Sequence, residues 1–172
     1  MDSPGHQNGW IDGAVARYER LLVGYAGRLL GNDFDAARDV VQDAFVRLCA
    51  QDRATVEPHL AEWLLAVVRN RAIDVRRKAG RMRLVDEREL ESPGDTDPAA
   101  IVQSQSDASS ITAMLDALPP NQAEVIRLKF QHGLSYQQIA NVTQLSVSNV
   151  GYLIHTGLKT LRERLRVNER SR

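Results

Sequence analysis

Residues 135–165 read SYQQIANVTQLSVSNVGYLIHTGLKTLRERL and predict two helices joined by a tight turn. Ser135 can cap the first helix, and Gln138 stands three residues later, where a capping box places its glutamine. Residues 143–145 form the predicted turn, and Ser146 can cap the second helix. This segment therefore decides the fold of the C-terminal part of the chain.

The predicted second helix has one apolar face and one polar face. Its apolar residues recur at helical spacing and are Val147, Val150, Ile154, Leu158, Leu161 and Leu165. The opposite side carries Ser148, Asn149, Tyr152, His155, Thr156 and Lys159. A buried seam with a polar outer face is typical of a helix-turn-helix, which places its second helix in the major groove of DNA. Any helical hairpin in a bundle would show the same pattern, so this segment alone leaves both interpretations open.

Composition favours a helical protein without disulfides. Of 172 residues, 43% are hydrophobic and only 5% are aromatic, and Ala, Leu, Arg and Gln are abundant, which favours helices over sheets. Cys49 is the single cysteine, so neither an intrachain disulfide nor a thiolate metal cluster can form. The N-terminus lacks a signal pattern, and no apolar run approaches the roughly 20 residues that span a bilayer. We therefore expect a cytoplasmic protein without membrane insertion.

The net charge of zero conceals a strong segregation of charge. Residues 69–83 hold seven basic and one acidic residue, whereas residues 84–110 hold one basic and seven acidic residues. Residues 111–172 hold eight basic and four acidic residues. Two basic zones on either side of an acidic strip indicate contacts with a polyanion at two places, although a basic helix face can also be merely solvated.

Apolar stripes predict three helices in the N-terminal part. They are centred on Tyr18–Leu30, Ala37–Leu48 and Leu60–Val75. Gly31 and Asn32 stop the first helix, Asp35 can cap the second, and the polar segment 51–59 with Pro58 is predicted to be a loop.

We predict an all-α protein of two small helical domains joined by a flexible acidic linker. The predicted N-terminal domain spans residues 12–83, and the linker 84–110 is rich in Pro, Gly, Ser and acidic residues. The C-terminal domain, residues 111–168, begins with a helix that ends at Pro119–Pro120. Asn121 with Glu124 suggests a capping box for the next helix, which stops near Gly133 and precedes the helix-turn-helix.

Three sequence motifs stand in order along the chain. They are DFDAARDVVQDAF at residues 33–45, then EWL at 62–64 with RNRAID at 69–74 and RR at 76–77, and finally ALP at 117–119 with GLSY at 133–136 and IA at 139–140. Together they resemble the bacterial extracytoplasmic-function (ECF) sigma factors, which keep only the second and fourth sigma regions. The resemblance covers nearly all of Tyr18–Leu165 and implies a promoter-recognition factor that binds core RNA polymerase.

The resemblance implies a role for each motif. The first would bind polymerase through Asp39, Val40, Gln42 and Asp43. The second would contact promoter DNA near the minus-ten element through Arg69, Asn70, Arg71, Arg76, Arg77 and Lys78. The recognition helix would read the minus-thirty-five element through Ser148, Asn149, Tyr152, His155 and Lys159. Base capture at the minus-ten element would fall to segment 51–59, whose only ring able to stack is His59, and Trp63 is expected in the core.

The recognition helix departs from the family pattern. Gly151, Leu153 and Thr156 stand where the family commonly has Lys or Arg, so we expect the isolated C-terminal domain to bind DNA weakly. Gly151 and Gly157 should each cost about 0.5–1 kcal/mol relative to Ala. The basic tail, which includes Arg162, Arg164 and Arg166, either adds affinity for the DNA backbone or only solubilises the last helix.

The main alternative is a helix-turn-helix regulator that binds operator DNA without polymerase. It would leave the motifs at 33–45 and 62–77 unexplained. The sequence does not favour an enzyme, because the four histidines lack ligand spacing and no phosphate loop or nucleophilic grouping is present. We expect no cofactor, and expect core RNA polymerase, promoter DNA and an anti-sigma factor as partners.

Overall fold

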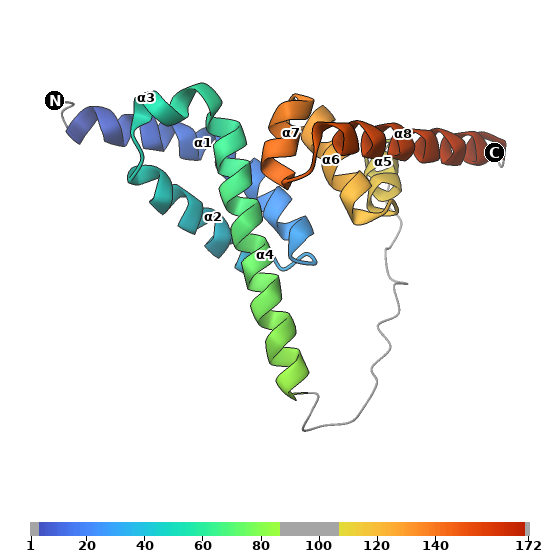
Figure 1. The fold of residues 1–172 in the computed structure, drawn as a ribbon, viewed down its shortest axis with the longest axis horizontal. Coiled ribbons are helices and arrows are strands. Elements are labelled where there is room, and N and C mark those ends of the chain that lie inside the picture. The colour runs from blue at the N-terminus through green and yellow to red at the C-terminus, as the bar shows by residue number, and fades with distance from the viewer. Residues whose placement is uncertain (1–3, 87–106, 171–172) are drawn as a thin grey trace. The chain divides into compact units, whose positions relative to one another are not determined.

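The computed structural model describes residues 4–86 and 107–170, and every element in these two ranges is a helix (Figure 1). The chain divides into two compact units, residues 1–93 and 94–172. The all-α prediction with two helical parts is confirmed. Most of the predicted linker lies outside the described residues, and the described part of it is helical at both ends.

Three long helices form the N-terminal unit. They are α1 (Pro4–Leu29), α2 (Phe34–Cys49) and α4 (Leu60–Asp86), and each packs against the other two. Between α2 and α4 lie the short helix α3 (Arg53–Val56) and the 3-10 turn η1 (Glu57–His59). The largest fully buried side chains of this core are Leu22, Val40, Leu48, Leu64, Leu65 and Val68. The long apolar stripes on α1, α2 and α4 therefore meet as the sequence predicts.

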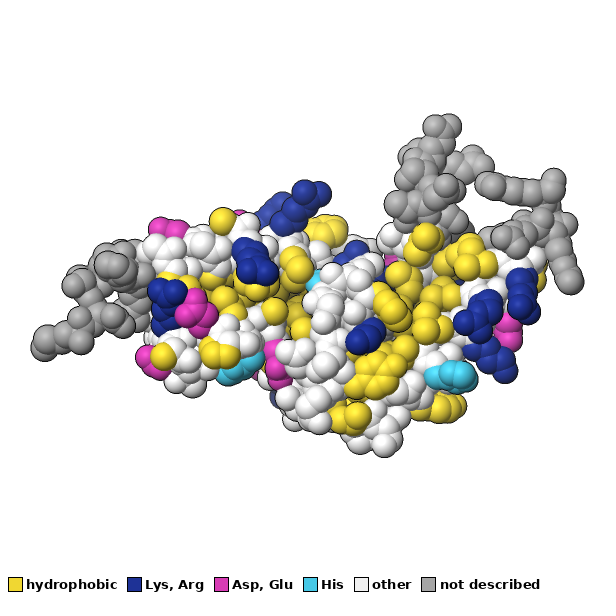
Figure 2. Space-filling view, turned by 90° about the horizontal axis from the view of Figure 1, so that it is seen from above, with side chains coloured by type: hydrophobic (Ala, Val, Ile, Leu, Met, Phe, Trp, Pro, Cys, Tyr) yellow, Lys and Arg dark blue, Asp and Glu magenta, His cyan; other side chains and the backbone are white. Residues whose placement is uncertain are grey.

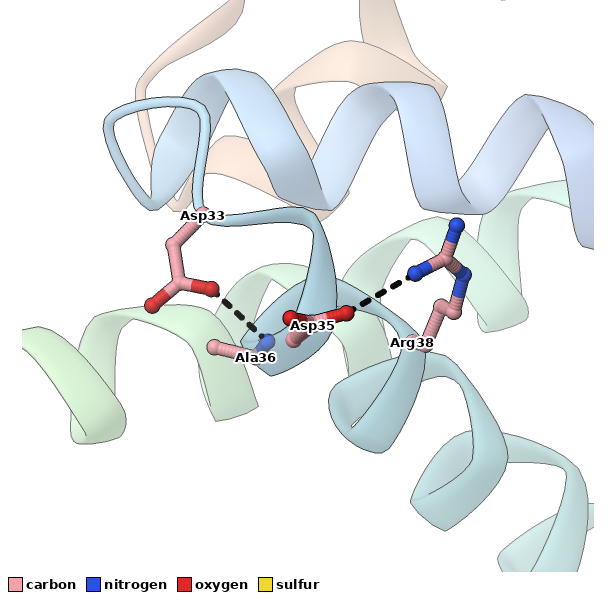
Figure 3. Close-up of polar contacts among 4 residues, drawn as sticks. All are labelled: Asp33, Asp35, Ala36 and Arg38. Carbon is pink, nitrogen blue, oxygen red and sulfur yellow. Dashed lines mark hydrogen bonds and ion pairs between the residues drawn. The ribbon is translucent and has the colours of Figure 1, made fainter.

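The start of α2 differs from the sequence prediction. Asp33, not Asp35, is the N-cap, and its carboxylate accepts a hydrogen bond from the backbone N–H of Ala36 at 3.0 Å (Figure 3). Asp35 lies in the first helical turn and forms an ion pair with Arg38 at 2.9 Å. Both aspartates suit the positive end of a helix, so composition alone could not decide between them.

Segment 51–59 is not the loop that the sequence predicts. Asp52 caps α3 by accepting hydrogen bonds from the backbone N–H of Thr55 at 3.0 Å and from its hydroxyl at 2.7 Å. Val56 is buried, which anchors this turn to the core. Pro58 is compatible with this helical segment because it lies in the first turn of η1, where a backbone N–H, which proline lacks, would have no helical partner.

Four helices form the C-terminal unit. They are α5 (Asp107–Asp116), α6 (Pro120–Phe130), α7 (Tyr136–Thr143) and α8 (Val147–Arg170). Helix α6 packs on α7 and α8, and α5 packs on α6 and α8. The predicted Asn121 cap is wrong: Pro119 is the N-cap residue and Pro120 occupies the first helical turn, where proline is favoured.

Helices α7 and α8 form the predicted helix-turn-helix. Ser135 and Gln138 make both hydrogen bonds of the capping box, and Ser146 accepts from the backbone N–H of Asn149 at 3.2 Å. Gln144 takes the left-handed conformation that ends α7, with φ 60°. The seam is closed by Ile139, Ala140, Val142, Val150 and Ile154, all of which are buried.

The apolar stripe of α8 is buried only in its middle. Val147 is 41% exposed and Leu165 is 45% exposed, although helical spacing places both on the inward face. Leu161 still packs against a cluster formed by α5, α6 and their connection, and Leu165 lies one turn beyond it. Periodicity shows which side of a helix is apolar, but not how far its neighbours cover it.

The two glycines of α8 have different surroundings. A Cβ on Gly157 would lie 2.5 Å from Cδ1 of Ile126, so the absence of a side chain allows α6 and α8 to approach closely. A Cβ on Gly151 would meet the Tyr136 ring at 3.6 Å, an ordinary contact.

We therefore expect different effects from replacing these glycines with alanine. Gly151→Ala should stabilise the protein by about 0.5–1 kcal/mol through helix propensity, whereas Gly157→Ala should give little or no stabilisation, because the displaced Cδ1 of buried Ile126 offsets the same gain. Thermal and urea unfolding of the two variants measure the difference. Equal stabilisation by both would contradict the close packing of Gly157 on Ile126.

Candidate nucleic-acid and protein interfaces

The outer face of α2 presents the predicted acidic group. Asp39 and Gln42 are exposed and Asp43 is half-buried. Val40 is only 2% exposed and lies in the core between the helices, so we remove it from the predicted binding residues. The exposed side chain of Val46 lies one turn after Gln42 and adds an apolar group to this face.

One ion pair joins two residues that the sequence assigns to different surfaces. The Arg71 Nε of α4 donates a hydrogen bond to Asp43 of α2 at 2.9 Å. Arg71 was predicted to contact DNA and Asp43 to contact polymerase. Because both side chains remain partly exposed, the pair contributes at most about 1 kcal/mol to stability. The ion pair fixes the orientation of the Arg71 and Asp43 side chains, so Arg71 is less available to DNA and Asp43 is less available to polymerase.

Residues 76–81, in the C-terminal half of α4, are exposed on all sides of the helix. Asn70 is exposed, and every residue from Arg76 to Arg81 is exposed, so this part of α4 extends beyond the core of its unit (Figure 1). Consecutive residues point in different directions around a helix, so Arg76, Arg77 and Lys78 surround α4 rather than share one face. Arg77 and Arg81, four residues apart, lie on the same side as Asn70.

Helix α3 and η1 lead directly into α4, and side-chain contacts connect them to the rest of the unit. Arg53 donates two hydrogen bonds to Glu57, at 3.0 and 2.8 Å, and its guanidinium lies 5.9 Å from the centre of the Trp10 ring. The hydrogen bond from Arg53 is the main cause that holds the pKa of Glu57 below its ordinary value. His59 is exposed and Trp63 is half-buried. The half-buried Trp63 is neither a free stacking surface nor a fully enclosed core residue.

The predicted reading face of α8 is accessible along its length. Its members are all exposed and are Ser148, Asn149, Tyr152, His155 and Lys159. The Tyr136 ring at the start of α7 lies beside Gly151, and the Lys129 ammonium lies 5.4 Å from the centre of that ring. The structure therefore brings these polar side chains onto one open helix surface, as base readout would require.

The buried Arg127 was not anticipated from the sequence. It is 6% exposed and forms an ion pair with Asp116, which ties α6 to the end of α5. The signal was the position of Arg127 between the apolar residues Ile126 and Leu128. Replacing Asp116 would remove this ion pair from the buried Arg127 guanidinium, which should lower the stability of the fold.

Comparison with family models matches both units. Residues 14–82 match the model described as Sigma-70 region 2, and residues 108–161 match the model described as Sigma-70, region 4. The chain is 30% identical over 141 residues to the ECF RNA polymerase sigma factor SigX of Bacillus subtilis, an alignment that covers 77% of this chain and 72% of SigX. The chain belongs to the ECF sigma factors.

Other relatives of this ECF sigma factor support the same family assignment. It is 28% identical to SigW of Bacillus subtilis, over 94% of this chain and 91% of SigW. It is also 28% identical to SigE of Mycolicibacterium smegmatis, over 90% of this chain but only 61% of SigE. A solved structure of the sigma factor RpoE from Bartonella quintana, in complex with the anti-sigma factor NepR, has the same fold, with a TM-score of 0.62 and 22% identity over 91% of this chain and 96% of that one.

Membership of this family agrees with the prediction that the chain is not an enzyme, because sigma factors are initiation factors. Among the described residues, no three His, Cys, Asp or Glu side chains gather as a metal ion would need. None of the described helices of this sigma factor combines the length and the apolar character that crossing a bilayer requires.

Proposed function

We propose that this ECF sigma factor binds core RNA polymerase and directs it to promoters that carry minus-ten and minus-thirty-five elements. The observation that carries the proposal is that one chain holds both sigma regions, each with an exposed face of suitable chemistry. The acidic face of α2 would bind basic groups of polymerase, while α4 and α8 would contact DNA.

The roles of the two DNA-binding helices differ. On α4, Arg69, Arg76, Arg77 and Lys78 would bind phosphates near the minus-ten element, with Asn70 beside them. Arg71 would have to break its ion pair with Asp43, or keep it while contacting DNA, to join this group. On α8, Ser148, Asn149, Tyr152 and His155 would face base edges, because each can donate or accept hydrogen bonds, and Lys159 would contact the backbone.

Co-purification tests this proposal against the alternative of a regulator that acts without polymerase. The full-length protein should co-purify with core polymerase and bind promoter DNA selectively only in that complex. Selective, tight DNA binding by the protein alone, without capture of core polymerase, would favour the alternative.

We expect Asn149→Ala to change the base preference at one minus-thirty-five position. Asn can make two hydrogen bonds to an adenine edge, and loss of such a pair should reduce discrimination by roughly 1–3 kcal/mol. Transcription from a promoter library by holoenzymes with wild-type and mutant sigma factor measures the base preference at each minus-thirty-five position. Gln137→Ala, on the exposed side of α7, is the control. An unchanged preference at every position would remove Asn149 from the reading surface.

An anti-sigma factor is a further proposed partner, and the cytoplasm the proposed location. The acidic face of α2 and the basic end of α4 are the surfaces that such a partner would cover, because covering either one would block initiation. The structure of the Bartonella quintana protein with NepR supports this kind of regulation by analogy of fold.

A further inference from the structure

One side of α8 carries polar side chains near its start and basic side chains toward its C-terminal end. Its members are three or four residues apart, a spacing that places them on one side of a helix, and are Ser148, Tyr152, His155, Lys159, Arg162 and Arg166. All of them are exposed. We call the last three members, Lys159, Arg162 and Arg166, the basic stripe.

The basic stripe borders a shallow hollow on α8. Its three members line the hollow together with His155, Leu158 and Glu163, and the hollow has a volume of about 350 Å³. Figure 2 shows basic side chains gathered near a histidine and one acidic side chain on this part of the surface. Arg164 differs, because it lines a separate hollow with Met114 and Val167. Arg164 therefore lies on a different side of α8 from the basic stripe, as helical spacing predicts.

The position of the basic stripe suits the edges of the DNA major groove. From Ser148 to Arg166 a straight helix rises about 27 Å, at about 1.5 Å per residue. The major groove is only about 12 Å wide, so a helix whose first turns enter it passes the flanking backbone with its later turns. Cations spaced by one helical turn would there meet successive phosphates.

The charge of α8 makes this contact necessary for tight binding. The reading half of the helix carries no cation at Gly151, Leu153 or Thr156. Phosphate contacts supply essentially all of the non-specific affinity of proteins for DNA and a large share of the specific affinity. The match to sigma region 4 ends at residue 161, so Arg162 and Arg166 lie beyond it.

We propose that Arg162 and Arg166, together with Lys159, bind the phosphodiester backbone beside the minus-thirty-five element and replace the charge that the reading half lacks. This inference rests on the proposed function. Glu163, on the rim of the same hollow, opposes the contact by repelling phosphate.

The test measures promoter binding by holoenzyme reconstituted from core polymerase and full-length protein, at salt concentrations between about 50 and about 200 mM. The Arg162→Ala, Arg166→Ala double variant should reduce the slope of log affinity against log salt by about two, which shrinks the advantage of the wild type roughly tenfold across that range. The loss should be equal for every minus-thirty-five sequence. Glu163→Gln should bind severalfold more tightly than the wild type at the low-salt end.

Arg164→Ala is the matched control, because it removes the same charge from the other side of α8, and it should leave the slope nearly unchanged. An unchanged slope in the double variant, or an equal effect of Arg164→Ala, would overturn the inference while the wild-type holoenzyme still binds promoters. Loss of core polymerase capture by the double variant would also overturn it, since the stripe would then bind an acidic protein surface. Failure of the wild type to bind promoters with polymerase would overturn the proposed function itself.

Discussion

Replacing Asp39 and Gln42 with arginine should lower the affinity for core RNA polymerase by at least about 100-fold. Like charges facing each other across an interface cost several kcal/mol, and each factor of ten corresponds to about 1.4 kcal/mol. Both side chains are exposed on α2, so the fold should persist. Asp43 is left unchanged in this variant because its ion pair with Arg71 would confound binding with stability. Capture of the protein on immobilised core polymerase measures the effect.

The matched control for docking is Asp12→Arg, which reverses an exposed carboxylate on α1. It should bind core polymerase like the wild type, and circular dichroism should show the same helix content for all three proteins. Unchanged affinity of the double variant would refute the assignment of α2 as the docking helix.

The second large effect is expected from the end of α4. Replacing Arg76, Arg77 and Lys78 with alanine should weaken formation of the open promoter complex and reduce its salt slope by about one to two, near 0.9 for each lost phosphate contact, because the three side chains point in different directions around α4. Alanine is the best helix former, and none of the three side chains is buried, so α4 should remain helical. Permanganate footprinting at several salt concentrations measures the open complex.

A triple variant of Arg17, Arg20 and Arg28 to alanine provides the control, because it removes three exposed cations from α1 of the same unit. It should leave the salt slope almost unchanged. Equal slopes for the wild type and the α4 variant would mean that those side chains stay solvated in the complex.

Local chemistry made much of the fold predictable. The capping box at Ser135, the turn that contains Gln144 and the cap at Ser146 are short-range features, and the structure shows all three. The stop at Gly31 and Asn32 is of the same kind, since both residues have positive φ. Each of these features depends only on residues within one turn of helix.

Features that depend on neighbouring helices were not predictable in this way. Leu165 has the right spacing to be buried, but it is largely exposed. Arg127 has the wrong chemistry to be buried, yet Asp116 of another helix compensates it. Val40 is a different case: helical spacing already places it on the apolar stripe of α2, and only the family motif assigned it to the docking face, so its burial agrees with the spacing.

The reading face of α8 was predictable as a surface, whereas the docking and minus-ten sites were predictable only as sets of residues. The sequence groups Arg71 with the DNA-binding cations and Asp43 with the docking face, and the structure pairs them instead. The separation of Arg164 from Arg162 and Arg166, by contrast, follows from the turn of about 100° per residue in a helix, and the structure agrees with it.

Transcription of a genomic promoter library by core RNA polymerase, with and without the full-length protein, tests the central claim most directly. We predict that transcripts start at a defined set of promoters only when the protein is present, and that these promoters share one minus-ten and one minus-thirty-five sequence at a fixed spacing. The same transcripts with and without the protein, under conditions in which it is folded, would contradict its assignment as a promoter-specificity factor.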